Sequence, residues 1–331
     1  MASEPTTGLI LGKFMPPHAG HLYLAEFAMN FVDRLIVLVC TLDREPIPGE
    51  LRYRWMRECL PDATVVHVTD DVPQTPDEHP DFWPIWADLV RRHSPFTPGF
   101  VFASEDYGTP LADVLDARYI PVDPARVSLR ASGTAVRSEP FAMWGVLPPP
   151  VRAHFARRVS VFGPESTGKS TLSELLARHF DTVHVPEWAR PFLDLKGGRC
   201  DREDIPLIAR GQCASEDALA RRCNRILICD TDPLLTTIWS DVLFGECPDA
   251  VTQCADARHY DLTLLLDVDV PWVDDDQRFL AAPDERRAFF DRCERALAGR
   301  GRRCVKIDGG WEARFGRAVE AIESLVPPSG S

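Results

Sequence analysis

Gly163-Pro164-Glu165-Ser166-Thr167-Gly168-Lys169-Ser170 lies near the start of the second half of the chain and sets the architecture of that half. The stretch matches every fixed position of the phosphate-loop pattern G-x-x-x-x-G-K-[ST]. An apolar run over 159–162 precedes it and leucines follow it at helical spacing, so a buried strand turns into a helix here. This is the context that a phosphate loop requires, and it predicts an α/β domain.

The residue types of this loop indicate its chemistry. Gly163 and Gly168 let the backbone bend so that N–H groups point at phosphate oxygens, and the helix N-terminus adds partial positive charge. We expect Lys169 to reach the β- and γ-phosphates of ATP and the Ser170 hydroxyl to ligate Mg²⁺. The other expected nucleotide contacts are Glu165, Ser166, Thr167 and Thr171.

The composition limits the classes of protein to consider. A length of 331 residues predicts about two domains. No stretch approaches the ~20 apolar residues of a membrane span, and no secretory signal is visible. Ten cysteines without a C-x-x-C pair indicate reduced thiols, so we expect a cytoplasmic protein. The net charge of −13 argues against binding to duplex DNA.

A second strand-to-helix turn lies near the N-terminus, where a strand over 8–12, a helix and a strand over 35–40 form a βαβ unit. Ring N–H groups of two histidines and the helix dipole can face an anion at this turn. The H-x-x-H spacing could also suggest a metal pair, but no further ligand lies nearby, and we favour phosphate binding. The candidate ligands are Gly12, Lys13, Phe14, His18, Gly20 and His21.

Another phosphate-binding helix start is predicted at residues 132–137. Ser132, Thr134 and Arg137 supply hydroxyls and a guanidinium there, and we expect the helix to run to about Trp144. A simple N-cap with an exposed arginine would account for Ser132 alone. Three prolines over 148–150 predict a linker, because proline cannot continue a helix. We therefore expect one domain over residues 1–152 and a second over 153–331.

Two helices of the first half carry residues that allow two interpretations. A helix over 50–60 carries Arg52 and two further arginines, which suit a solvated face and a phosphate contact equally. A helix over 82–93 carries Trp83 and Trp86, which we interpret as core residues rather than a stacking platform.

Acidic residues follow two strands beside the phosphate loop. Glu187 comes after a strand over 182–185, and Asp230 and Asp232 follow a strand over 225–229. Acids at a strand end beside such a loop are typical of a Walker B position, so we expect Asp230 to face the metal. Asp232 also suits an N-cap for the helix that begins next.

The ordered motifs resemble a known family. Gly12-Lys13-Phe14, Pro17-His18-Ala19-Gly20-His21 and Ser132-Gly133-Thr134 with Arg137 are similar to the nicotinamide-nucleotide branch of the H-x-G-H nucleotidyltransferases. The phosphate loop with Glu187-Trp188-Ala189-Arg190, Asp230-Thr231-Asp232 and Trp272-Val273-Asp274-Asp275 resembles the ribosylnicotinamide kinase module. Together, over roughly residues 8–326, they resemble the NadR family of bifunctional enzymes. Ala19, Ala131 and Asp276 depart from the usual Thr, Ile and Gly.

The resemblance implies an α/β fold with two domains, each built on a mostly parallel sheet. The N-terminal one would be a Rossmann-like H-x-G-H nucleotidyltransferase domain and the C-terminal one a P-loop kinase domain. The kinase would phosphorylate nicotinamide riboside with ATP and Mg²⁺, and the transferase would adenylylate the resulting mononucleotide (NMN) to NAD. Some family members begin with a DNA-binding domain; the first strand here starts at Gly8, so we expect no DNA binding. A homo-oligomer is compatible with the sequence.

The resemblance also implies residue roles. His18, His21, Lys13 and Arg137 would hold the triphosphate and the departing pyrophosphate. Glu187 would be the general base of the kinase or a ligand of the riboside hydroxyls, Ser170 and Asp230 would hold the metal, and Arg278 would close from a mobile lid over 272–278. Further nucleotide contacts would come from Gly12, Phe14, Gly20, Ser132, Thr134, Trp188 and Arg190.

Two other functions remain open on the sequence. One is a transferase for another small nucleotide or phosphopantetheine, fused to a generic nucleoside kinase. The other is a nucleotide-sensing module that binds without turnover. Intact motifs in both halves argue against the sensor, since a sensor could lose Lys169 or His21 without penalty.

Overall fold

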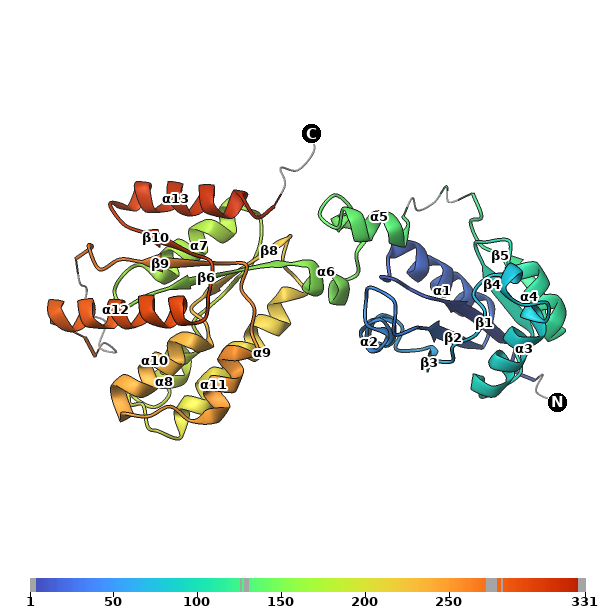
Figure 1. Ribbon diagram of the computed structural model, residues 1–331, viewed down its shortest axis with the longest axis horizontal. Coiled ribbons are helices and arrows are strands. Elements are labelled where there is room, and N and C mark those ends of the chain that lie inside the picture. The colour runs from blue at the N-terminus through green and yellow to red at the C-terminus, as the bar shows by residue number, and fades with distance from the viewer. Residues whose placement is uncertain (1–3, 126, 128–130, 272–278, 281, 327–331) are drawn as a thin grey trace. The chain divides into compact units, whose positions relative to one another are not determined.

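The computed structural model describes residues 4–125, 127, 131–271, 279–280 and 282–326. The chain divides into two compact units, Met1–Val151 and Arg152–Ser331, so the division falls one residue before the predicted boundary. Each unit is built on a five-stranded sheet with helices on both faces (Figure 1). All of the pairings between these strands are parallel, as the alternation of strands and helices along the sequence predicted.

The first unit has the strand order β3-β2-β1-β4-β5, which is a Rossmann-like arrangement. Its strands are β1 (Thr7–Gly12), β2 (Arg34–Cys40), β3 (Thr64–Val68), β4 (Phe100–Ala103) and β5 (Arg118–Pro121). Its α-helices are α1 (Ala19–Phe31), α2 (Gly49–Cys59), α3 (Phe82–His93), α4 (Gly108–Leu115) and α5 (Gly133–Ser138), with 3-10 turns η1 (Pro76–Glu78) and η2 (Trp144–Val146). Helix α6 (Pro149–Phe155) leads into the second unit.

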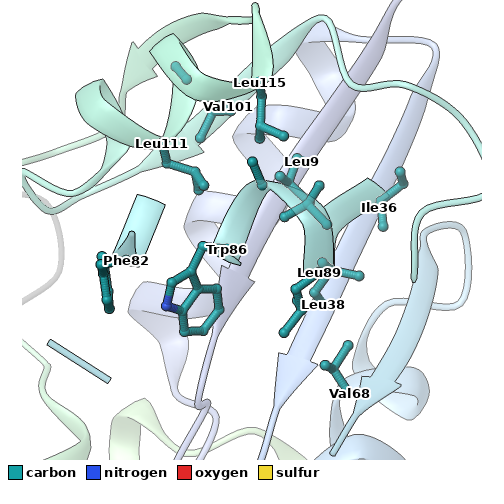
Figure 2. Close-up of a cluster of buried hydrophobic side chains, with 13 residues drawn as sticks. Leu9, Ile36, Leu38, Val68, Phe82, Trp86, Leu89, Val101, Leu111 and Leu115 are labelled. Atoms are coloured by element: carbon teal, nitrogen blue, oxygen red, sulfur yellow. The ribbon is translucent and has the colours of Figure 1, made fainter. Parts of the chain in front are cut away.

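Alternate residues of the strands face opposite layers, because successive side chains of a strand point to opposite sides. Leu9 and Leu38 pack with α3 and α4 in the cluster that Figure 2 shows. Ile10 and Val37 pack with α1 and α2 on the other face. Trp86 belongs to the first cluster and its Nε1–H donates to the Pro73 carbonyl oxygen at 2.9 Å, which confirms it as a core residue.

The second unit has the strand order β10-β9-β6-β8-β7. Its strands are β6 (Arg157–Phe162), β7 (His184–Val185), β8 (Ile226–Asp230), β9 (Leu262–Leu266) and β10 (Cys304–Ile307). Its helices are α7 (Lys169–His179), α8 (Ala189–Asp194), α9 (Asp204–Ala220), α10 (Pro233–Phe244), α11 (Asp249–Asp256), α12 (Pro283–Gly299) and α13 (Trp311–Glu323). Helices α7 and α13 pack on one face of the sheet, and α10 and α12 pack on the other.

This topology fixes where ligands can bind. Helices α1 and α4, which follow the adjacent strands β1 and β4, lie on opposite faces of the first sheet. Helices α7 and α10, which follow the adjacent strands β6 and β8, do the same in the second. Where helices that follow two adjacent strands lie on opposite faces, a crevice opens at the carboxyl ends of the strands. Parallel α/β sheets bind their ligands in this crevice.

Two sequence predictions near the end of the first unit are wrong. Helix α5 ends at Ser138 and not near Trp144. Pro140 explains this, because the residue before a proline is disfavoured in the helical conformation. The prolines over 148–150 do not form an extended linker, since α6 begins at Pro149. Proline is tolerated in the first turn of a helix, where its missing N–H has no intrahelical partner to lose.

Candidate active sites

The phosphate loop connects β6 to α7 as the sequence predicted, and its two glycines are sterically required. Gly163 has φ 136°, and a Cβ there would lie 2.8 Å from the Leu266 carbonyl oxygen. Gly168 has φ 85°, and a Cβ there would lie 2.4 Å from the indole of Trp311. Trp311 itself is 58% exposed, so its ring covers the loop from the solvent side.

Lys169 is folded back into its own loop. Its side chain is buried, and Nζ donates to the Pro164 carbonyl oxygen at 2.8 Å. Thr167 Oγ1 donates to the same oxygen at 2.9 Å. Lys169 directly follows Gly168, and the backbone N–H groups of this loop can surround a phosphate. A phosphate oxygen could therefore replace the Pro164 carbonyl oxygen as the partner of the ammonium group.

Buried arginines brace the loop from behind. Arg314 is 1% exposed and donates to the carbonyl oxygens of Thr167 and Asp267, both at 2.9 Å. Arg286 is also buried and donates to the Ser166 carbonyl oxygen at 3.4 Å. Sequence reasoning missed Arg314, although its spacing of four residues from the buried Ala318 places it on the inner face of α13.

Glu165 holds the segment that follows residues 272–278. Its carboxylate accepts the backbone N–H groups of Phe279 and Leu280, at 3.2 and 2.5 Å. Arg278 and the rest of the predicted lid lie outside the described residues. The described contact ties a position of the phosphate loop to the two residues that follow the predicted lid.

Asp230 ends strand β8 in a buried position, 2% exposed. Burial raises its pKa to about 6, and the Glu187 carboxylate contributes in the same direction. Lys169, a hydrogen bond with Ser170, and Arg190 act in the opposite direction. The structure thus brings together four of the five residues predicted for the kinase reaction and its metal, namely Lys169, Ser170, Glu187 and Asp230.

Asp232 has a structural role. Its Oδ1 accepts the Leu234 N–H at 2.7 Å as the N-cap of α10, which is the alternative that the sequence offered. Its Oδ2 accepts Ser160 Oγ at 2.6 Å and Arg302 Nη1 at 2.7 Å. These bonds satisfy the buried carboxylate.

A pocket of about 410 Å³ opens beside the loop, and both polar and apolar side chains line it. Its polar lining is Glu165, Ser166, Thr167, Gly168, Lys169, Ser170, Thr171, Glu187, Arg190, Gln212, Thr231 and Thr236. Its apolar and thiol lining is Ala189, Leu193, Cys200, Ile205, Ile208, Leu235, Trp239, Leu243 and Phe279. Trp188 is not part of the lining, because its indole packs on Gly211 and stacks on Phe192 at a centroid distance of 5.0 Å.

The histidines of the first unit lie at the start of α1, as predicted. Their rings stack with centroids 3.7 Å apart, and the backbone N–H of His18 donates to His21 Nδ1 at 3.3 Å. Since Nδ1 accepts, the ring proton of a neutral His21 is on Nε2. A Cβ on Gly20 would lie 3.1 Å from the His18 ring, so the glycine leaves room for this stack.

The two motifs of the first unit meet. Arg137 Nη1 donates to the Met15 carbonyl oxygen, and Arg137 Nη2 donates to Thr134 Oγ1 at 3.3 Å. A Cβ on Gly133 would lie 2.7 Å from the same Met15 oxygen. Ser132 is the N-cap of α5, with Oγ accepting the Ala135 N–H at 3.1 Å. The second motif is therefore seated on the turn that carries the histidines.

Lys13 and Arg52 share one carboxylate. Lys13 Nζ lies 3.0 Å from Glu45 Oε1, and Arg52 donates to Glu45 Oε2 at 2.6 Å and to the Lys13 carbonyl oxygen at 2.8 Å. Burial alone would raise the pKa of Glu45, but the Leu42 N–H and these cations hold it below its ordinary value. Arg52 is fully buried. It is thus neither a solvated residue nor an exposed phosphate ligand, which corrects both interpretations of the 50–60 helix for this position.

Two features of the described residues concern metal binding and membrane insertion. Within the described ranges, His, Cys, Asp and Glu side chains form no group of three or more that could hold a metal ion. In the same ranges, every helix is too short or too polar to cross a membrane.

Comparison with known proteins supports this picture. Residues 9–111 match the cytidylyltransferase-like family, and residues 158–314 match an AAA domain family. The trifunctional NAD biosynthesis/regulator protein NadR of Salmonella typhimurium is 26% identical over 99% of this chain and 85% of its own length. The chain is NadR-like over nearly its full length. The family resemblance inferred from the motifs is thereby confirmed.

A second NadR sequence shows the same similarity, and two solved NadR structures share the fold of this chain. NadR of Escherichia coli K12 is 26% identical over 98% of this chain and 84% of its own length. A NadR crystal structure in complex with NR has a TM-score of 0.77 at 21% identity, covering 97% of this chain and 96% of that one. Another NadR structure, in complex with NAD and AMP-PNP, has a TM-score of 0.74 at 22% identity, covering 97% of this chain and 96% of that one. This NadR-like chain thus combines a nucleotidyltransferase-like domain with a P-loop kinase-like domain.

Proposed function

We propose that this NadR-like chain makes NAD in two steps that each consume ATP. The kinase domain transfers the γ-phosphoryl group of ATP to the 5′-hydroxyl of nicotinamide riboside, giving NMN and ADP. The transferase domain joins NMN to the AMP part of a second ATP, giving NAD and pyrophosphate. The observation that carries the proposal is a phosphate-binding turn in each domain of a chain that matches NadR over 99% of its length.

In the kinase step the nucleophile is an alcohol, and a general base assists it. The 5′-oxygen attacks the γ-phosphorus, the bond from that phosphorus to the β–γ bridging oxygen breaks, and ADP leaves. We assign the proton to the Glu187 carboxylate, which lines the pocket and acts electrostatically on Asp230. A riboside-binding role for Glu187 is the alternative. Lys169 would leave the Pro164 oxygen and face the β- and γ-phosphates.

The oxygen donors beside Lys169 fit Mg²⁺. Ser170 offers a hydroxyl, and Asp230 offers a buried Oδ1 that has no hydrogen-bond partner among the described residues. Mg²⁺ prefers one or two such ligands together with substrate phosphates. When bound, it would neutralise charge on the β- and γ-phosphates. Burial raises the pKa of Asp230, and the positive charge of a bound Mg²⁺ would favour the ionised carboxylate.

In the transfer step the nucleophile is a phosphate anion, so no base is needed and catalysis consists of positioning and charge stabilisation. An NMN phosphate oxygen attacks the α-phosphorus of ATP, the bond to the α–β bridging oxygen breaks, and pyrophosphate leaves. Negative charge grows on that bridging oxygen. We assign its stabilisation to Lys13, His18, His21 and Arg137, with Gly12, Phe14, Gly20, Ser132 and Thr134 shaping the site.

ATP labelled at different phosphates tests both steps in one assay. With nicotinamide riboside and Mg²⁺, γ-labelled ATP should give labelled NMN, and α-labelled ATP should give NAD that carries the α-label. Labelled NMN without NAD would restrict the activity to the kinase domain. No transfer to riboside, with transfer to a different nucleoside or to phosphopantetheine, would replace the proposed substrates.

A further inference from the structure

Gln212 occupies an unusual position in the pocket beside the phosphate loop. It belongs to α9, borders the pocket and is only 2% exposed. Its Oε1 accepts the Trp188 backbone N–H at 3.0 Å. Its Nε2 is buried and has no hydrogen-bond partner among the residues that the structure describes. A buried amide nitrogen with two unused hydrogens is costly, so it indicates a missing acceptor.

Chemistry fixes the orientation of this amide. The Trp188 backbone N–H can only donate, so the Gln212 atom that faces it must be the carbonyl oxygen. Turning the amide over would set two donors against each other. The hydrogen-bonding capacity that Gln212 has left is therefore a pair of N–H donors, which can be satisfied only by an acceptor such as an oxygen.

The backbone that orients Gln212 is itself fixed. A Cβ on Gly211 would lie 2.2 Å from the Trp188 indole, so ring and helix are in close contact, and the indole also stacks on Phe192. Trp188 directly follows Glu187, the candidate base. The Gln212 amide is thus held in a fixed relation to the segment that carries the carboxylate. A donor fixed in advance loses little entropy when a ligand binds to it.

The surroundings of Gln212 make a lone donor informative. Ile208 and Ile205, four and seven residues earlier on α9, line the same pocket with apolar side chains. Leu235 and Trp239 of α10 also line it. Where the lining of a pocket is apolar, specificity comes from the polar groups placed among the apolar side chains. The part of the pocket away from the phosphate loop can therefore take a nucleoside whose oxygen meets Nε2.

We propose that Gln212 determines nucleoside specificity by donating a hydrogen bond from Nε2 to an acceptor oxygen of the riboside. The oxygen belongs either to a ribose hydroxyl or to the carbonyl of the base substituent. The inference rests on the proposed kinase function and adds a residue to it. Gln212 takes no part in the phosphoryl transfer itself.

Two substitutions test the donor. Gln212→Glu retains an oxygen for the Trp188 N–H and replaces the donor by a second oxygen, while Gln212→Met removes both functions at similar length. Each should lower kcat/KM for nicotinamide riboside by about 10–100-fold, as expected for a buried hydrogen bond left unmade. The KM for ATP should not change. Gln253→Met, at an exposed position of α11, is the matched control and should match the wild type.

Riboside analogues identify the oxygen and separate recognition from structure. The penalty of Gln212→Met should vanish for the one analogue that lacks the contacted oxygen: the 2′-deoxy riboside, the 3′-deoxy riboside or the pyridinium riboside without a carboxamide. An equal penalty on all of them, or an unchanged kcat/KM in both variants, would overturn the inference and leave the proposed function intact. A wild-type chain that phosphorylates no riboside would overturn both.

Discussion

Arg302 donates to Asp232 at 2.7 Å beneath the turn that carries Asp230, and neither side chain is open to solvent: the side chains are 9% and 0% exposed. Ser160 Oγ completes the contacts of the Asp232 Oδ2 atom at 2.6 Å. Because α10 begins at the residue after Asp232, the pair fixes the helix start directly behind the candidate metal ligand. The two residues are 70 positions apart in the sequence.

Arg302→Met should destabilise the second domain by about 3–5 kcal/mol, because it leaves a buried carboxylate without its partner. The free energy of unfolding from urea denaturation measures this. Asp232→Asn retains an N-cap and removes the charge, so the double variant should recover part of the loss. Arg303→Met, at the exposed neighbouring position, serves as the control. Additive effects of the Arg302 and Asp232 substitutions would mean that the pair is not coupled.

Lys169→Ala should abolish riboside phosphorylation while leaving adenylyl transfer from supplied NMN nearly unchanged. The buried ammonium group belongs to the phosphate loop of the second unit, and the histidine turn belongs to the first. Labelled-ATP assays of each half-reaction measure the two rates. Equal loss of both activities in a folded variant would contradict the assignment of two separate phosphate sites.

His21→Ala should give the opposite pattern, with transfer reduced by about 10²–10³-fold and the kinase spared. The loss should appear mainly in kcat, because charge on the bridging oxygen grows only as pyrophosphate leaves. A histidine with a purely structural role would instead lower stability, with kcat per folded molecule nearly retained. A histidine that binds metal would add sensitivity to a Zn²⁺ chelator, so kinetics with and without chelator separate the three roles.

Glu187→Gln should lower the kcat of the kinase by about 10²–10⁴-fold and change the KM for ATP little, as expected for loss of a general base. The matched control is Glu174→Gln on the exposed side of α7, where Glu174 pairs only with Arg178 among the described residues. A near-normal kcat with a raised KM for riboside would reassign Glu187 to binding of the riboside hydroxyls.

Glu216 should make the stability of the second domain depend on pH. Burial raises its pKa to about 7, although Tyr260 and Arg158 donate to it at 2.7 and 2.9 Å. The folded state therefore binds a proton that the unfolded state releases near pH 4.5. The stabilisation is complete below about pH 4.5 and is lost as the pH rises to 7.

Glu216→Gln removes this dependence, so the free energy of unfolding should shift by roughly 3 kcal/mol in favour of the variant between pH 4.5 and 7.5. Urea denaturation at several pH values measures the shift. Asp217→Asn is the control: partial burial alone would raise the pKa of Asp217, but Arg258 holds it below its ordinary value, outside this window. A parallel pH profile for the wild type and Glu216→Gln would refute the assignment.

Local sequence signals predicted most of the fold. The phosphate loop at 163–170, the strand over 8–12 and the helix over 82–93 were readable because turn chemistry and hydrophobic periodicity act within a few residues. Helices α4, α8 and α11 were not anticipated, since each spans eight residues or fewer and offers little periodicity. Pro140 was a readable stop signal for α5 that the sequence interpretation passed over.

The candidate site residues that belong to sequence motifs were predicted. The residues whose roles depend on packing in the folded chain were missed. Lys169, Asp230 and His21 lie where their motifs indicated. Arg52 and Arg314 did not stand out, because an arginine in a helix reads as solvated until the fold supplies carbonyl oxygens from distant loops. Gln212 also did not stand out in the sequence, because its role depends on a hydrogen bond from the Trp188 backbone N–H, 24 positions away.

The contact between Trp311 and Gly168 equips the protein with an internal optical probe. The indole is exposed to solvent on one side and lies over the glycine that closes the phosphate loop on the other. Its emission depends on the polarity and charge around the ring, and these would change if anionic phosphates entered the loop beneath it. Occupancy of the candidate kinase site would then alter the Trp311 share of the fluorescence of the chain's eight tryptophans.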